Sequence, residues 1–600
     1  MPNLVTNKFK IHNAEQFIES LSETSATYLY LFLGKVESWD DENSVPAPTD
    51  SVSNTSYDYW RSMIAAKKLS SADVSHIIPR LDWQTSTAYT AYSQKNNDQF
   101  ANNFYVVTDD LNVYKCIQNN VANGVSTIKP TGTTSGTIEL DDGYKWKFMY
   151  TISPQDVLKF TTSQYIPVKR VGNVNDGSTQ YTVEQSSVDG SIDVINRTSN
   201  GNFFVELTSN PTDATGNEVR DFVEGEIITG QTSGNKGTII SFTSSANSLS
   251  YSPDANALFV NNEVLVGNTS GAYATISQDV VSTYKFTENI FASVTNTTVL
   301  QLNTDANTTS DDVYVGSTIF ISNNAGRGEQ SVISAYDATL RRITVANAFT
   351  VSPNSSSGYI IGPTITIDGD GTEATARAVG NSTFGVKEVI VNNRGKNYTT
   401  ASVSISANSS HGSGANAEVV ISPYGGHGFN AIEELGGNRV MIDSRITGNE
   451  SGFFTTENQF RQVGLVRDPL QSANANAFFT SDLADQSTRI TLSSVSGQFK
   501  SDEIVFQGDT LSTSTANGVV IDFLNNNKLR LNRVQGTFVS NTTVSAITGA
   551  NSGATASIVA NGIANADMKP YSGDILYIEN RTSVTRSTNQ IEDFKIVLEF

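Results

Sequence analysis

The sequence predicts a mainly β, multi-domain protein: a β-sandwich-like scaffold with a few flanking helices in its N-terminal part and inserted small β-repeat modules. At 600 residues the chain is longer than one hydrophobic core usually organises. Its long middle is rich in Ser, Thr, Asn, Gly and Val, and contains segments that repeat. Its ends differ, because all four Trp (Trp39, Trp60, Trp83 and Trp146) precede residue 150 and the segment 571–600 is again aromatic and mixed in charge.

The first predicted elements alternate between strands and helices. Residues 8–11 are predicted as a strand, followed by a helix that Asn13 caps. The apolar run 28–33 predicts a buried strand that ends at Gly34.

A second helix is predicted around residue 60. Tyr57, Trp60, Met63 and Ile64 are spaced three or four residues apart, as on the buried face of a helix. Residues 77–83 are expected to be extended, because a proline within them restricts the residue before it.

A hairpin and a further strand complete the N-terminal part. Residues 104–108 and 113–117 alternate in hydrophobicity on either side of a polar turn, and 143–150 alternate in the same way. Cys116 is the only cysteine, so no intrachain disulfide is possible. We expect it to be a buried structural thiol rather than a reactive one.

The middle of the chain contains imperfect repeats. Residues 222–234 are echoed by 259–271, more loosely by 538–553, and more weakly from residue 499. Each copy predicts a strand, a tight glycine turn and a second strand. One such unit cannot bury its own apolar face, so copies should pack on one another or on a neighbouring sheet. Their uneven spacing favours small β-modules over a regular solenoid.

Two further stretches predict more short strands. The first runs from 316 to 361. The second covers 364–421, with glycine-rich elements around 368–376 and 411–417 that each precede an alternating strand.

Composition argues against two classes of partner. The net charge is −21 and the basic residues are scattered, so no nucleic-acid-binding surface is predicted. No apolar run approaches the ~20 residues of a membrane-spanning helix, so no membrane role is expected. The N-terminus lacks the apolar core of a signal peptide, which predicts synthesis and assembly in a cytoplasm.

Two glycine-containing motifs resemble ligand loops only in part. The segment from Asp368 to Gly371 could begin a Ca²⁺ loop, but its twelfth position is Val379 instead of the required Glu. Gly326-Arg-Gly328 and Gly412-Ser-Gly414 lack the Lys-Ser/Thr of a phosphate loop. Turn roles are predicted for all three.

No catalytic, cofactor-binding or metal-binding residue is predicted, and the protein is not expected to be an enzyme or to need a cofactor. Four acidic pairs could supply the carboxylates of a glycosidase, although most lie in predicted turns. They are Asp40-Asp41, Asp109-Asp110, Asp141-Asp142 and Glu433-Glu434. The four histidines (His12, His76, His411 and His427) lack metal-ligand spacing, and His427 lies in a glycine-rich loop.

Several segments near the ends carry a family resemblance. In chain order they are 31–39, 78–83, 136–146, 460–470, 572–581 and 596–600. They include uncommon combinations such as Ile78-Pro-Arg-Leu-Asp-Trp83, and they resemble the baseplate wedge subunit known as gene product eight of T-even-type contractile-tailed phages.

The resemblance implies a division of the chain. The scaffold would comprise 1–170, 427–475 and the closing strands 567–600, interrupted by β-repeat insertions at 171–426 and 476–566. Because the ends close one body, each insertion should leave and re-enter it at nearby points.

The resemblance also implies a function. The protein would be a non-enzymatic structural component of the virion's tail baseplate, a homodimer in each of six wedges that contacts other wedge subunits and rearranges when the tail sheath contracts. The alternative is a receptor- or glycan-binding tail adhesin, with Tyr273, Tyr314, Tyr336, Tyr359 and Tyr398 either as exposed sugar platforms or as strand core.

Overall fold

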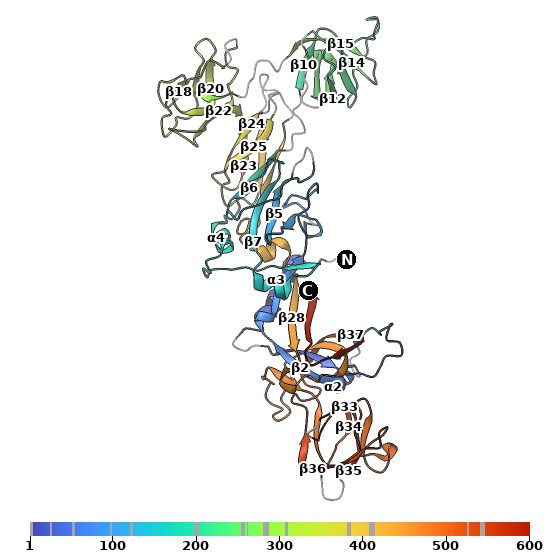
Figure 1. Ribbon diagram of the computed structural model, residues 1–600. Helices are drawn as coiled ribbons and strands as arrows, with labels where there is room; N and C mark the ends of the chain where they lie inside the picture. The colour runs from blue at the N-terminus through green and yellow to red at the C-terminus, as the bar shows by residue number, and fades with distance from the viewer. Residues whose placement is uncertain are drawn as a thin grey trace. The chain divides into compact units, whose positions relative to one another are not determined.

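The structure is a computed structural model built mostly of β-strands, as the sequence predicts (Figure 1). It describes residues 4–600 except 24–26, 51–54, 97–98, 120–123, 197–202, 254–258, 261, 280–286, 307–309, 381–385, 407–414, 525–526 and 541–545. The chain forms two compact units. The first contains residues 1–80, 152–169 and 435–600, and the second contains 81–151 and 170–434.

Two antiparallel sheets form a sandwich in the first unit. One has the order β30 (Leu483–Asp485), β2 (Met63–Leu69), β1 (Leu29–Gly34), β29 (Asn458–Arg467), β37 (Asp574–Arg586). The other has the order β38 (Ile591–Glu599), β28 (Arg439–Thr447), β3 (Val74–Pro79), β8 (Tyr165–Pro167). The red C-terminal strand β38 lies beside the orange β28 (Figure 1). Side chains of both sheets share one hydrophobic core.

Strand β1 explains why the chain has an unbroken apolar run here. Leu29, Leu31 and Leu33 face the core between the sheets, while Tyr30 and Phe32 pack into a second cluster on the other face. Every residue of β1 is buried, so neither face can be polar. The sequence-based prediction of a buried strand ending at Gly34 is therefore confirmed.

Two helix predictions at the N-terminus were wrong in their boundaries. Helix α1 covers Asn7–Glu19 and includes the residues predicted as a strand at 8–11. Its cap is Thr6, not Asn13, because the Thr6 side chain accepts a hydrogen bond from the Phe9 N–H at 3.3 Å.

The second helix ends earlier than its spacing predicted. Helix α2 covers Thr55–Ser62, and Met63 and Ile64 begin strand β2. Pairing of β2 with β1 and burial of its first four residues outweigh the helical spacing of these side chains. A third helix, α3 (Pro154–Phe160), begins at a Ser153 cap.

The first unit also contains a closed barrel. Its order is β31 (Thr488–Ser496), β34 (Lys528–Gly536), β33 (Ala516–Leu524), β32 (Ile504–Gln507), β35 (Ala546–Gly549), β36 (Thr555–Ala564). The third and fourth repeats predicted from the sequence supply β35–β36 and β32–β33. Each is a strand, a turn and a strand, as predicted.

The second unit contains a barrel of the same strand order. It runs β10 (Phe203–Leu207), β13 (Ser248–Pro253), β12 (Lys236–Thr243), β11 (Ile227–Gly230), β14 (Val264–Gly267), β15 (Tyr273–Asp279). The first two repeats form β11–β12 and β14–β15 and pair with each other through β11 and β14. The prediction that repeat copies pack together in small modules is confirmed.

Other sheets of the second unit surround separate cores. A four-stranded sheet has the order β4 (Tyr105–Val107), β5 (Asn112–Gln118), β7 (Lys145–Thr151), β6 (Thr137–Glu139), which confirms the predicted hairpin and strand. A seven-stranded sheet has the order β16 (Thr287–Ile290), β22 (Gly358–Pro363), β19 (Ser317–Ile321), β20 (Gln330–Asp337), β21 (Arg342–Val345), β18 (Val299–Gln301), β17 (Ser293–Val294).

Three two-stranded pairs share one further core in this unit. They are β23 (Ile365–Gly369) with β26 (Ala401–Ile405), β24 (Thr375–Gly380) with β25 (Val386–Asn393), and β9 (Ile192–Asn196) with β27 (Ala417–Ile421). Two short helices, α4 (Thr179–Ser186) and α5 (Ala431–Leu435), complete the unit.

Chain segments that flank the predicted insertions lie close together. The Arg170 guanidinium is 4.6 Å from the centre of the Phe429 ring. In the first unit, Gln471 forms a β-bridge with Met568, and the Asp485 N–H donates to Asp567 at 2.8 Å. The boundaries assigned to the insertions stay a prediction.

Buried glutamates fasten the repeats of each barrel to one another. Glu226 accepts hydrogen bonds from the N–H groups of Thr269 and Ser270 in the turn of the other repeat. Glu263 reciprocates, accepting from Thr232 at 2.8 Å and Ser233 at 2.5 Å. We call this arrangement the glutamate clasp.

We number the barrels in chain order, so that the first is formed by β10–β15 and the second by β31–β36. The clasp recurs once in the described residues of the second barrel. Glu503 accepts from the N–H groups of Asn551 and Ser552 and from the Ser552 hydroxyl. In every copy the carboxylate occupies the space where a Cβ on a turn glycine (Gly230, Gly267 or Gly549) would be. Burial alone would raise the pKa of these carboxyls, but the hydrogen bonds outweigh it and lower the pKa.

We predict that Glu226→Ala destabilises the first barrel by about 1–3 kcal/mol, because it leaves several part-buried N–H groups without their acceptor. Hydrogen exchange of β11–β15 in the full chain measures this local effect. Glu224→Ala is the matched control, since Glu224 is exposed two residues away and should change stability by less than about 0.5 kcal/mol. Equal effects of both substitutions would contradict the clasp.

The clasp also predicts that the stability of both barrels depends on pH. The pKa values of Glu226, Glu263 and Glu503 are lowered below the ordinary 4.5, so their contribution is complete above that pH and lost as pH falls through the folded-state values. The barrels should lose protection in hydrogen exchange on acidification. Glu263→Gln should be less stable near neutral pH but lose less stability on acidification.

Candidate functional site

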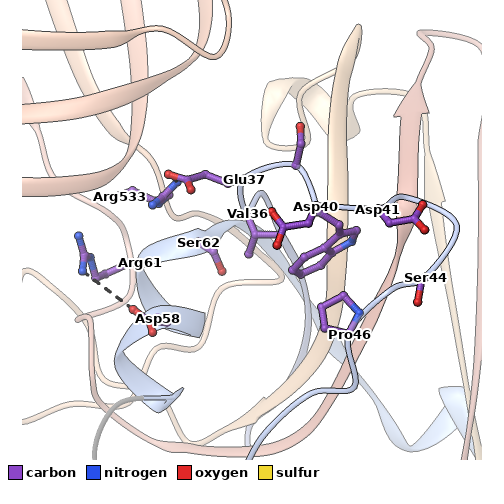
Figure 2. A pocket seen from close by; sticks show the side chains of 12 residues that line it. Val36, Glu37, Asp40, Asp41, Ser44, Pro46, Asp58, Arg61, Ser62 and Arg533 are labelled. Carbon is purple, nitrogen blue, oxygen red and sulfur yellow. Dashed lines mark ion pairs between the residues drawn. The ribbon is translucent and has the colours of Figure 1, made fainter.

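A groove in the first unit lies where the second barrel meets the scaffold loop that follows β1. We call it the seam groove; its volume is about 610 Å³. The residues that line it are Val36, Glu37, Ser38, Trp39, Asp40, Asp41, Ser44, Pro46, Asp58, Arg61, Ser62 and Arg533 (Figure 2). Helix α2 supplies three of them, and strand β34 of the barrel supplies Arg533.

The seam groove carries more acidic than basic side chains. Arg533 forms an ion pair of 2.5 Å with Glu37, and Arg61 lies 4.0 Å from Asp58, as Figure 2 shows. Glu37 and Asp58 are 78% and 71% exposed, so these pairs add little stability and are available to a charged partner. The charged side chains of the groove are therefore largely exposed to solvent.

Hydrogen bonds to strands β37 and β29 fix the loop that forms the seam groove. The Trp39 indole N–H donates to the Arg581 carbonyl at 2.9 Å, which ties the loop to β37. Glu42 accepts from the Arg461 guanidinium at 2.8 Å. This hydrogen bond holds the pKa of Glu42 below its usual value. Segments from three distant parts of the sequence thus position one surface.

A buried ion pair is the main charged feature inside the second unit. Lys115 of β5 and Glu434 of α5 are in contact, and both side chains are almost completely buried. Glu434 also accepts from the N–H groups of Gly428 at 2.8 Å and Asn430 at 3.2 Å. Burial lowers the pKa of Lys115, against the opposing effect of Glu434. The pair links the β5–β7 sheet to the loop before α5.

His427 and Lys147 lie in the surroundings of this pair. Burial, with Lys115 and Lys147 nearby, holds the pKa of His427 well below its ordinary value, so the ring is neutral. Its ring meets Tyr92 edge-on at 5.0 Å. Burial also lowers the pKa of Lys147 to about 8. His427 is therefore part of a packed interior and not an exposed ligand.

Asp370 and the glycine motifs noted in the sequence have structural roles where the structure describes them. Asp370 accepts from the N–H groups of Thr399 and Thr400, both at 2.9 Å, and these bonds with the Thr399 hydroxyl lower its pKa. Gly326 and Gly328 have positive φ angles, as turn glycines do. His411 and Gly412-Ser-Gly414 lie outside the described residues. Among the residues that are described, no three His, Cys, Asp or Glu side chains gather as metal ligands would.

The four acidic pairs are dispersed. Asp109 and Asp110 lie in the β4–β5 turn, where Lys129 pairs with both. Asp142 caps the backbone N–H groups of Thr127 and Ile128. Glu434 is the buried partner of Lys115, and Asp40-Asp41 line the seam groove.

The remaining single residues are mostly interior. Cys116 is buried, and burial raises the pKa of its thiol. The His76 ring nitrogen Nδ1 lies 2.9 Å from the Gly437 carbonyl oxygen. Tyr314, Tyr336, Tyr359 and Tyr398 are buried, whereas Tyr273 is half-buried and His12 is exposed on α1. Within the described part of the chain, no helix combines the length and apolar character needed to cross a membrane.

Comparison with known proteins finds a sequence likeness to a phage baseplate protein in the N-terminal third of the chain. The family model described as Bacteriophage T4, Gp8 matches residues 3–123 and 107–197, which confirms the resemblance of the segments 31–39, 78–83 and 136–146.

A particular relative is the baseplate wedge protein gp8 of Enterobacteria phage T4. This chain is 25% identical to it over 219 residues, which cover 30% of the chain. The match spans 65% of that relative's length, slightly less than two thirds.

We predict that Lys115→Met destabilises the second unit by about 3–5 kcal/mol, because it leaves the Glu434 carboxylate buried without a countercharge. Lys115→Met combined with Glu434→Gln should recover part of that loss. Denaturant unfolding followed by hydrogen exchange measures both. Lys95→Met is the matched control, since the pair of Lys95 and Glu418 is largely exposed and should change stability by less than about 1 kcal/mol.

Proposed function

We propose that the protein is a structural component of a phage tail baseplate wedge, which assembles through protein–protein contacts and does not act as an enzyme. One observation carries the proposal. The segments that resemble the family lie far apart in the sequence, yet they supply β1, β29, β37 and β38 of a single sandwich. The family match within residues 3–197 covers β1 and the other N-terminal strands of the same body.

The finer parts of the proposal concern assembly. The protein forms a homodimer in each wedge, contacts other wedge subunits, and takes part in the rearrangement of the baseplate when the sheath contracts. Closed symmetric oligomers are the usual arrangement for such subunits. It is assembled in the host cytoplasm and resides in the tail baseplate of the virion. It binds neither nucleic acid nor membrane in this role.

The burial of most of the candidate tyrosines argues against the adhesin alternative. A sugar platform needs an exposed aromatic face. Four of the five candidate tyrosines are at most 6% exposed, and all four belong to hydrophobic cores. They pack in hydrophobic cores, Tyr336 and Tyr359 within strands and Tyr314 and Tyr398 in the segments between strands.

The proposal predicts where the protein lies in the virion. Electron microscopy of purified particles should find it in the baseplate as about twelve copies, two in each of six wedges. Trimers at the tips of tail fibres would contradict the proposal and favour the adhesin.

A further inference from the structure

The end of the β1–β29 pair contains a buried lysine against a buried amide. Lys35 directly follows β1 and is 3% exposed, and Asn458 begins β29 and is 5% exposed. The Lys35 Nζ donates a hydrogen bond to the Asn458 Oδ1. The same Nζ lies 2.8 Å from the Asp502 carboxylate. These side chains, all in the first unit, bring an amine, a carboxamide and an acid together; the amine and the carboxamide are buried, whereas the Asp502 side chain is 65% exposed.

We propose that Lys35 and Asn458 are a site of covalent self-modification, in which they form an intramolecular isopeptide bond. This goes beyond the proposed structural role and does not depend on it. The amide carbon is one bond, about 1.2 Å, from the oxygen that Lys35 contacts, so Nζ approaches the distance of a reactive encounter.

The Asn458 amide is both fixed and polarised. Its Oδ1 also accepts a hydrogen bond from the Gln459 N–H at 2.9 Å, and this donor stabilises negative charge that develops on the oxygen during attack. Its Nδ2 donates to the Ile521 carbonyl at 2.7 Å. Both ends of the amide are therefore held while its oxygen contacts the lysine.

Two carboxyls handle the protons. Asp502 contacts the Lys35 ammonium and can accept its proton, which frees the lone pair. Asp522 follows Ile521, and burial raises its pKa to about 6, against the effect of Arg530. Its buried Oδ1 makes no hydrogen bond within the described residues. Asp522 lies 3.8 Å from the Arg530 guanidinium and near enough to Lys35 for the lysine charge to act on it, so it is placed to exchange a proton with the reacting groups just below neutral pH.

The step balances without a co-reactant. The Lys35 ammonium gives up two protons as its Nζ forms a bond to the Asn458 Cγ and the bond from Cγ to Nδ2 breaks. Nδ2 takes one of them, directly or by way of Asp522, and leaves as ammonia, while the other passes through Asp502 to solvent. No group is oxidised or reduced. The product is a secondary amide between side chains 423 residues apart in sequence.

The buried pair of Lys115 and Glu434 offers a comparison, because there a lysine contacts a carboxylate instead of a carboxamide. Glu434 accepts from two backbone N–H groups and from Lys115, which stabilise its anionic form. A carboxylate anion is a poor acceptor for an amine, whereas a neutral carboxamide polarised by a backbone donor is a better one. Lys115 and Glu434 therefore remain an ion pair.

The test is the mass of the denatured full-length protein. The cross-linked chain should be lighter than its sequence by about 17 Da, the mass of ammonia, and digestion should yield one branched peptide that joins Lys35 to Asn458. An unmodified mass for the purified wild-type protein, after incubation at neutral pH, would overturn the proposal.

Variants separate this loss from other sources of the same mass change. Lys35→Arg keeps the charge but cannot form the bond, so it should have its full mass. Lys67→Arg, at another lysine that pairs with a carboxylate, should keep the loss of ammonia. Asp522→Asn should slow the loss by at least about tenfold. Persistence of the loss in Lys35→Arg would show that it arises elsewhere and would overturn the assignment.

Discussion

The pairing of β1 with β29 is the constraint on which the rest of the structure depends. Residues 29–34 pair antiparallel with 462–467, so the scaffold closes only after more than 400 residues have been made. Every residue of β1 is buried, and its two faces serve two different cores. Since loss of this strand would expose both cores, the segments between β1 and β29 must fold without disturbing it.

A closed module such as the first barrel, which lies between β1 and β29, meets that requirement. A barrel pairs all its strands internally and leaves no long edge that could compete with β1 for its partners. Two imperfect repeats close each barrel, and the glutamate clasp satisfies backbone groups in the turn of one repeat with a side chain from the other. The clasp works only between repeats, so it favours the paired arrangement over an isolated unit.

Much of the fold could be predicted from the sequence, because alternating hydrophobicity and glycine turns are local signals. Met63 and Ile64 were wrongly assigned to a helix because their spacing also fits one. Only the pairing of β2 with β1 makes them part of a strand. The clasp was missed although Glu226, Glu263 and Glu503 occupy the same position in three repeats, a signal that the sequence did contain. The seam groove could not be predicted, because Arg533 reaches Glu37 only through the packing of the second barrel on the scaffold.

The difference between the scaffold strands and the barrels also bears on where the family likeness is found. The family match lies within residues 3–197, and the first barrel begins at β10, just beyond it. A scaffold strand such as β1 has buried neighbours on both faces and both edges, so most substitutions in it disturb several contacts at once. A barrel joined to the rest through its ends can change its outward-facing residues while its own core and clasp stay intact. The barrels are therefore parts in which the sequence can vary, whereas the sandwich must keep the geometry that buries both faces of β1.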